Sequence, residues 1–425
     1  MQATVVMAWS RRHFLSSSAA LALGSCAARR TAPAVASSIR FWTMQLKPTF
    51  DAYMQERLTA FAGMAEGVPV EWVDVPWGDM ENKILTAVAA NTGPDVVNLN
   101  PQFASRLAEK NALVDLAPLL SPSQQAVYFP NLWRANQLGS VTFGLPWYVA
   151  TDITLYNRDL LRQADWDPDQ PPQTYSQLAS AAIQIRQKTG KPGFMLTMDG
   201  SQMLEAMVLM DMALLDEEGQ AAFDDAIGRE AFAYWVDLLQ AGGIPRETLT
   251  ESHRRAIELY QAGELAMLLT GPQLLTQIVE NAPQIAQVSD VAPQIAGSQG
   301  RKSASVMNLV IPQKSQNIPA ALQFALFLTN SPNQLAFAQI ANTLPSTIAT
   351  VSDPYFTQST SDSLLEKARL LSAAQLSQSE VLIPPMQGLD DLRKIIYEEL
   401  QLAMLQQKTV DQAVTDAATR WNQRL

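Results

Sequence analysis

The sequence predicts an α/β fold built around a mainly parallel sheet. Strand-like and helix-like segments alternate from residue 39 onward, as they do in strand–helix–strand units. A Gly-Pro turn at residues 93–94 leads into the apolar run 95–99, which is typical of a buried strand. With 425 residues and 47% hydrophobic side chains, the chain is long enough for two domains with substantial cores.

The first elements follow one another closely. Apolar residues alternate or run together where a strand is expected, and they recur every three to four residues where a helix is expected. Asp79 has the residue type of an N-cap and precedes a helical pattern. In order, we expect a strand at 39–42, a helix at 49–66, a strand at 68–75, a helix at 79–91 and a strand at 95–99.

The later elements continue the pattern with more helix. Residues 174–177 match a capping box, so a helix should begin there. Helices dominate residues 201–265. In order, we expect strands at 153–157, 265–270 and 306–311, and helices at 178–189, 320–328, 334–341, 392–407 and 410–421.

An export signal is expected at residues 1–25. Arg11 and Arg12 open an apolar run that is too short to cross about 30 Å of hydrocarbon as a permanent anchor. The arginine pair resembles the twin-arginine signal for export of folded proteins, and a plain basic start of a signal for the unfolded-chain route stays open. The end of the run resembles a bacterial lipobox, in which Cys26 carries the lipid and residues 26–38 form a tether.

Composition excludes several classes of protein. The formal net charge is −11, and no basic stripe is present to neutralise nucleic-acid phosphates. Of the two histidines, His13 lies in the signal and only His253 remains, and no thiol follows Cys26. Ser-His-Asp and Cys-His catalysis in their usual arrangements are therefore excluded, as is a His/Cys zinc site. We expect no metal and no cofactor.

Five sequence blocks, in this order, carry a resemblance to a known family. Each block alone is short, but together they span nearly the whole chain after the export signal. The blocks are residues 75–79, residues 87–97, residues 144–148 with 155–161, residues 263–267 with 270–272, and residues 409–413.

Together these blocks resemble the extracellular solute-binding proteins of family 1, the maltose-binding-protein-like sugar receptors of ABC importers. The resemblance implies a type II periplasmic-binding-protein fold, with two discontinuous lobes, a hinge and an interlobe cleft. It places residues 39–150 and 301–333 in lobe 1. It places residues 151–300 and 334–425 in lobe 2. The ligand would drive hinge closure through its higher affinity for the closed form.

The resemblance also implies a function and partners. The protein would capture a sugar or related neutral glycoside and deliver it to the transmembrane subunits of a permease, without catalysis. It would act outside the cytoplasm as a monomer, held to the membrane through Cys26, and would bind no nucleic acid. Two alternatives remain, an exported binding protein for a charged solute such as a polyamine or peptide, and an exported glycosidase.

A sugar has hydroxyl groups at its rim and apolar C–H faces, so its site needs flat aromatic rings beside side chains that form paired hydrogen bonds. Such side chains occur here at expected strand ends and loops, where ligands lie in open α/β sheets. The candidate ligand-binding residues are Trp42, Met44, Gln45, Trp77, Asp79, Asn98, Asn100, Trp147, Tyr148, Asp152, Thr270, Gly271, Gln273, Ser305, Asn308, Gln387 and Asp390.

Several of these candidates have a structural alternative. Trp77 has the position of a hydrophobic staple onto the following helix, and Trp42 has the pattern of a core residue. Trp147 and Tyr148 are adjacent on an extended segment, so only one of them should face the cleft, and Trp147 is favoured. Gln273 stands where many relatives carry an aromatic ring, which weakens stacking on that side.

Overall fold

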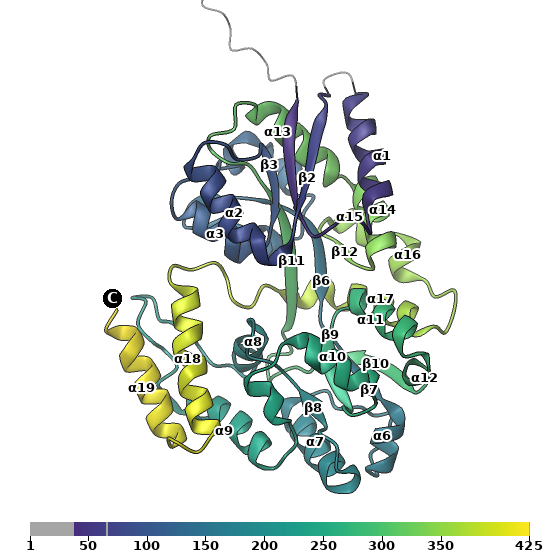
Figure 1. Cartoon of the computed structure of the whole chain (residues 1–425), viewed down its shortest axis with the longest axis vertical. Helices are drawn as coiled ribbons and strands as arrows, with labels where there is room; N and C mark the ends of the chain where they lie inside the picture. Colours follow the sequence, from purple (N-terminus) through teal and green to yellow (C-terminus); the bar gives the residue numbers. More distant parts are fainter. Residues whose placement is uncertain (1–37, 65–66, 425) are drawn as a thin grey trace, which may run out of the picture. The chain divides into compact units, whose positions relative to one another are not determined.

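Two separate β-sheets organise the part of the chain that the structure describes, residues 38–64 and 67–424 of a computed structural model (Figure 1). The export signal, Arg11, Arg12, Cys26 and nearly all of the tether lie outside these residues. The larger sheet has the strand order β12-β6-β11-β3-β1-β2, with β13 paired to β11. Its strands are β1 (Ile39–Met44), β2 (Val70–Val75), β3 (Val96–Leu99), β6 (Leu145–Thr151), β11 (Lys302–Val310), β12 (Leu344–Pro345) and β13 (Ser379–Glu380).

The larger sheet is mixed, which corrects the prediction of a mainly parallel one. Strand β1 is parallel to both β2 and β3, as the alternating pattern indicates. Strand β11, however, is antiparallel to both β3 and β6, and β12 is antiparallel to β6. Strand β11 enters the larger sheet after β10 of the smaller sheet, so local alternation does not reveal its direction.

The smaller sheet has the strand order β10-β7-β9-β8. Its pairs are antiparallel except for β8 with β9. A separate hairpin joins β4 and β5. The bounds are β4 (Gln137–Leu138), β5 (Val141–Thr142), β7 (Ile153–Asn157), β8 (Phe194–Met195), β9 (Met267–Thr270) and β10 (Ser289–Pro293).

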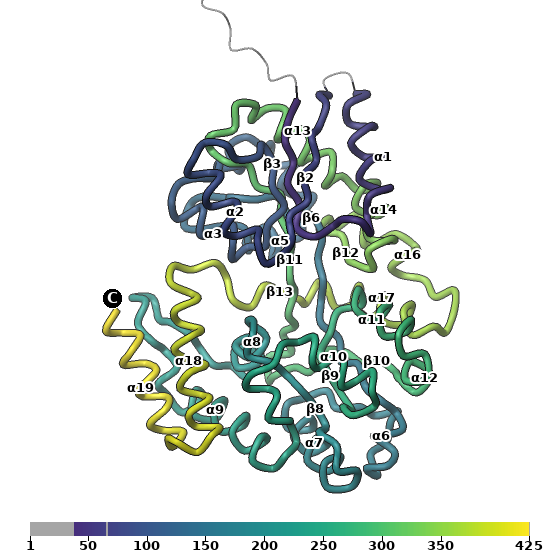
Figure 2. The backbone as a smooth tube through the Cα atoms, in the orientation of Figure 1, coloured from purple at the N-terminus to yellow at the C-terminus, as the bar shows by residue number. Residues whose placement is uncertain are grey.

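The helices divide between the two sheets (Figures 1 and 2). Those with the larger sheet are α1 (Asp51–Ala62), α2 (Trp77–Ala89), α3 (Pro101–Ala108), η1 (Ala117–Leu119), α4 (Pro122–Gln125), α5 (Pro130–Arg134), α13 (Ile318–Leu328), α14 (Ser331–Ala341), α15 (Ile348–Val351) and α16 (Pro354–Thr357). Those with the smaller sheet are α6 (Arg158–Gln163), α7 (Tyr175–Thr189), α8 (Gln202–Leu209), α9 (Ala226–Gln240), η2 (Arg246–Leu249), α10 (His253–Gln261), α11 (Pro272–Asn281), α12 (Pro283–Ala286), α17 (Leu364–Gln375) with η3 (Leu376–Gln378), α18 (Leu389–Met404) and α19 (Val410–Asn422). No helix in the described ranges has the length and apolarity that a membrane crossing requires.

One connection between the sheets is a single residue long. Strand β6 of the larger sheet ends at Thr151, strand β7 of the smaller sheet begins at Ile153, and Asp152 is the single residue between them. Strand β11 returns beside β6, and at its start the Ser303 N–H donates to Gln294 Oε1 over 2.7 Å. Figure 1 shows β6 and β11 running side by side from one sheet toward the other.

The expected start of the second helix is wrong. Helix α2 begins at Trp77 after Pro76, whose φ of −53° and ψ of 145° suit the residue before a helix. Asp79 therefore lies inside the first turn, and its side chain caps nothing. It contributes through its charge at the helix N-terminus instead.

Aromatic rings fill the core beside the larger sheet. Phe41 packs edge-on against Phe324, with 5.1 Å between ring centroids. Trp147 stacks on Phe337 with 5.2 Å between centroids and 25° between planes. Phe337 belongs to α14, and β12 pairs with β6. Residues just after 333, which we expected in lobe 2, thus pack on the larger sheet.

The C-terminal helices lie beside the smaller sheet. Helices α18 and α19 pack on each other and on α9. Trp235 of α9 and Trp421 of α19 belong to the same buried core. This part of the C-terminal segment therefore does lie with the second sheet.

Replacing Trp147 tests the first core. The Trp147 side chain has 0% exposure, so Trp147→Ala should lower the free energy of unfolding by about 3–5 kcal/mol through lost contacts and a residual cavity. Urea unfolding followed by circular dichroism measures this change. Trp77→Ala is the matched control, because Trp77 is 46% exposed and its loss should change stability by only about 0.5 kcal/mol. Equal unfolding midpoints for the two variants would contradict the core assignment.

Candidate functional site

A cavity of about 280 Å³ lies where the chain crosses between the sheets. Helix α2 and helix α3 border it with their first residues, α8 borders it from the smaller-sheet side, and β11 forms part of its wall. Asp152, the residue between β6 and β7, also lines it. The lining residues are Trp77, Asn100, Pro101, Gln102, Asp152, Ser201, Gln202, Glu205, Ala304, Ser305, Val306, Met307, Val381 and Ile383.

Local sequence explains why these side chains meet. Pro101 follows Asn100, and proline at the first helical position with asparagine before it is a strong helix start. The Asn100 side chain accepts a hydrogen bond from the Phe103 N–H over 2.8 Å, which fixes the start of α3 at the end of β3. Helix α2 begins directly after the end of β2, with Pro76 as the residue before the helix and no side-chain cap. Trp77 and Asn100 are therefore held at the ends of β2 and β3, the two strands that flank β1.

Two carboxyl groups face the cavity, and the pKa of each is raised above its ordinary value. Burial, followed by repulsion from Glu205, raises the pKa of Asp152 to about 7. Burial also raises the pKa of Glu205, while the Ser303 O–H, which donates to Glu205 Oε2 over 2.7 Å, opposes that rise. Within the described residues, the Asp152 carboxyl group has no hydrogen bond or ion pair. It therefore remains free to meet a ligand.

Polar contacts from α3 join the two halves of the cleft. Gln102 Nε2 donates to Ser201 Oγ over 2.9 Å. Arg106 forms ion pairs with both Glu81 on α2 and Asp390 on α18. Because Ser201 and Asp390 belong to elements beside the smaller sheet, these contacts hold the cleft in the conformation described.

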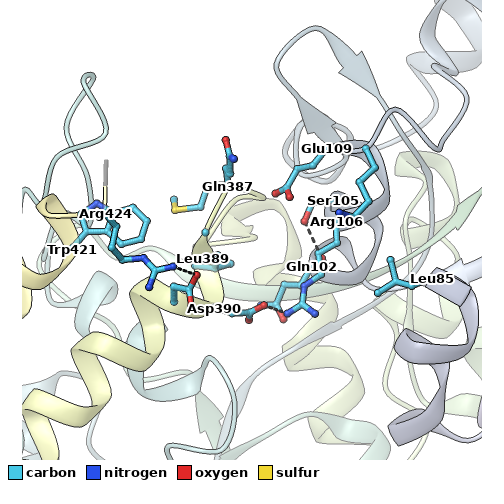
Figure 3. Close-up of a pocket in the computed structure, with 14 residues that line it drawn as sticks. Leu85, Gln102, Ser105, Arg106, Glu109, Gln387, Leu389, Asp390, Trp421 and Arg424 are labelled. Atoms are coloured by element: carbon cyan, nitrogen blue, oxygen red, sulfur yellow. Dashed lines mark hydrogen bonds and ion pairs between the residues drawn. The ribbon is translucent and has the colours of Figure 1, made fainter. Parts of the chain in front are cut away.

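A second cavity of about 770 Å³ adjoins the first, and Gln102 lines both. Figure 3 shows side chains from α3 on one side of it and side chains around the start of α18 on the other. Acidic and basic groups are mixed on its walls. The lining residues are Leu85, Gln102, Ser105, Arg106, Glu109, Lys110, Met386, Gln387, Gly388, Leu389, Asp390, Asp391, Trp421 and Arg424.

The structure brings some of the expected site residues together. Trp77, Asn100, Asp152 and Ser305 line the first cavity, and Gln387 and Asp390 line the second. Gln45 lies next to Trp77, since its Oε1 accepts the Trp77 N–H over 3.3 Å. Asp79 is exposed on the first turn of α2.

Other expected site residues lie in the protein interior or pack against it. Trp147 has no exposed surface, and Tyr148 packs against Trp147 and Phe337. The Gln273 carboxamide folds over Gly271, where an added Cβ would meet it at 2.2 Å. The fully or nearly fully buried candidates are Trp42, Met44, Asn98, Trp147, Thr270 and Asn308.

Sequence reasoning missed several lining residues. Gln102, Ser201 and Gln202 belong to helix starts that the sequence did not single out. Glu205 carried a usable signal, because it is the one charged residue in the apolar helix α8. A buried charge in such a helix needs a partner or a function.

Comparison with known proteins confirms the predicted family resemblance. Residues 45–335 match the family described as bacterial extracellular solute-binding protein. A candidate oligosaccharide periplasmic-binding protein from Synechococcus sp. MITs9220, solved in complex with zinc, is 41% identical, with a TM-score of 0.84 over 91% of this chain and 98% of that one. The two-lobed type II fold is therefore confirmed. Among the described residues here, no three His, Cys, Asp or Glu side chains are grouped so as to hold a metal ion.

Two curated relatives are more distant. A candidate binding protein of Brucella abortus is 22% identical over 394 residues, which cover 91% of this chain and 92% of that protein. The arabinooligosaccharide-binding protein of Bacillus subtilis is 21% identical over 272 residues, which cover 62% of each chain.

The raised pKa of Asp152 predicts that the stability of the fold depends on pH. Because its pKa is higher in the folded chain than its ordinary value of 3.8, the folded state binds this proton more tightly than the unfolded state. The stabilisation is complete below about pH 4 and is lost as the pH rises toward about 7. Asp152→Asn should remove this part of the pH dependence. Urea unfolding of both proteins across this pH range measures the free energy of unfolding. The same pH dependence of that free energy in both proteins would contradict the prediction.

Proposed function

This chain belongs to the bacterial extracellular solute-binding protein family, and we propose that it captures a sugar outside the cytoplasm and delivers it to the permease of an ABC importer. One observation carries the choice of a sugar. An exposed tryptophan, Trp77, stands at the edge of a cavity whose lining combines carboxyl, amide and hydroxyl groups with apolar side chains. A sugar needs this combination, with a flat ring for its C–H face and hydrogen-bonding groups for its hydroxyls.

Relatives support the same class of ligand. The arabinooligosaccharide-binding protein of Bacillus subtilis is named for a carbohydrate, and the 41% identical Synechococcus protein is described as a candidate oligosaccharide-binding protein. We therefore assign ligand capture without chemical turnover to this chain.

Hinge closure would complete the site. Asp152 and β11 connect the two sheets, so rotation about them would move α3 relative to α8. The Gln102–Ser201 contact would form only when α3 approaches α8, and the Arg106–Asp390 contact only when α3 approaches α18. A ligand that bridges the cleft would favour that state through its differential affinity.

The contacts also support a division into lobes. The first lobe would hold residues 39–150 and most of β11, together with α13 to α16, because Phe337 and β12 pack on the larger sheet. The second lobe would hold residues 153–300 and the segment from α17 onward.

We also propose that the protein acts as a monomer tied to the membrane by a lipid on Cys26. The residues after Cys26 up to the first strand at Ile39 provide a tether of about a dozen residues. At about 5–6 Å times the square root of its length, such a tether reaches roughly 20 Å. Export by the twin-arginine route would follow from Arg11 and Arg12.

Binding tests the sugar assignment. A panel of mono- and oligosaccharides should contain a ligand that raises the melting temperature of the mature protein and changes its tryptophan fluorescence. Trp77→Ala should weaken that binding by about 1 kcal/mol, roughly five-fold in Kd, because ring stacking is lost. Isothermal titration calorimetry measures the change. Ile227→Ala, an exposed apolar residue on α9 outside the cavity, should bind as the wild type does. Failure of the whole panel, with a polyamine or peptide raising the melting temperature instead, would sink the assignment.

Anchoring has its own test. Cys26→Ser removes the only thiol in the chain, so the exported protein should move from the membrane fraction to the soluble fraction. Fractionation with immunoblotting measures the distribution, and Thr31→Ser in the tether serves as the control. Continued membrane association of the Cys26→Ser protein would exclude a lipid on this residue.

A further inference from the structure

The first cavity has an unbalanced set of charges. Among its lining residues, Asp152 and Glu205 are acidic and none is basic. The two groups are close enough for the charge of Glu205 to act on Asp152. The ionisable groups that a ligand meets in this cavity are therefore carboxyl groups only.

The surroundings stabilise the negative charge of Glu205 more than that of Asp152. Glu205 accepts the Ser303 O–H and lies in the first turn of α8, where the helix dipole favours negative charge. The neighbouring titratable groups on other elements are Tyr175 and Tyr397, which are neutral phenols with pKa values raised by burial. Asp152 lies between two strands and has no comparable support.

Nearby bases are already engaged. Arg393 reaches the cavity lining with a 3.3 Å hydrogen bond to Ser201, but its other terminal nitrogen is paired with Asp390 over 2.8 Å. Lys302 precedes Ser303 and donates to the backbone carbonyl of Gln294 instead. Neither base lines the cavity.

Among the lining residues, the buried polar atom that lacks a hydrogen-bond partner is an acceptor. Gln202 Oε1 is buried and has no hydrogen-bond partner within the described residues. The Asp152 carboxylate, when ionised, also only accepts. An ammonium group has three donors and a positive charge, whereas each hydroxyl of a neutral sugar has one donor. The Trp77 ring adds a face that attracts both C–H groups and cations.

We propose that this cavity selects a saccharide that carries a protonated amino group, with the ammonium held by Asp152 and Glu205 and the sugar ring on Trp77. This inference rests on the proposed function, because it names a class of sugar for the same site. It also has a measurable consequence. The carboxyl pair holds a proton when the cavity closes without a cation, and a bound ammonium group replaces that proton, which passes to the buffer.

Isothermal titration calorimetry can test both parts. The ligands are chitobiose, which carries two free amines, its N,N′-diacetyl form and cellobiose. All three are measured at one pH, at which the amines of chitobiose are protonated. Chitobiose should bind at least about ten-fold more tightly than either neutral disaccharide. Its binding heat should differ between two buffers of different ionisation enthalpy, because a proton is released. The neutral disaccharides should show no such difference.

Two variants separate charge from shape. Asp152→Asn keeps the side-chain size but removes the charge, so the ten-fold preference for chitobiose should fall to about two-fold while binding of the neutral disaccharides persists. Glu205→Gln provides the same test if Asp152→Asn unfolds, and circular dichroism reports folding. Asp237→Asn, an exposed carboxylate on α9 without a hydrogen bond from its side chain to a described residue, is the control and should keep the preference.

The outcomes are distinct. A neutral disaccharide that binds as tightly as chitobiose, or an Asp152→Asn protein that keeps the full preference, overturns the amine selection and leaves the sugar receptor intact. Wild-type protein that binds no carbohydrate of either kind overturns the amine selection together with the proposed function.

Discussion

The single-residue connection between β6 and β7 is the constraint on which the rest of the structure depends. Asp152 is the only residue between a strand of the larger sheet and a strand of the smaller one, and β11 returns beside it. So short a link leaves few dihedral angles for motion between the sheets. It also fixes an ionisable side chain at the crossing point. The same residue therefore limits the motion between the sheets and carries an ionisable group at the cavity.

Local patterns predicted most elements but not the long-range pairings. Strand β1 and helix α14 follow from apolar periodicity alone. The direction of β11 does not, because its partners β3 and β6 are far away in sequence. Trp147 illustrates the same limit. Alternation separates its side from that of Tyr148, but only the packing of α14 decides that the Trp147 side is covered.

The same distinction between local patterns and long-range contacts applies to the residues of the candidate site. Trp77, Asn100 and Asp152 were predictable because they stand at strand ends, where sequence and topology agree. The contact between Ser303 and Glu205 joins residues 98 positions apart, and it exists only because α8 packs near the start of β11. No local pattern encodes that approach. The unusual charge within the apolar helix α8 was the one clue in the sequence.

The position of Gln102 has a consequence for ligand length. Its side chain lines both cavities and is held to Ser201 by a hydrogen bond between neutral groups, a type of bond worth about 1 kcal/mol. One rotamer change would therefore alter the lining of both volumes at small cost. A ligand that extends from one volume into the other would pass this side chain, so the conformation of Gln102 bears on the ligand length that one backbone conformation accepts.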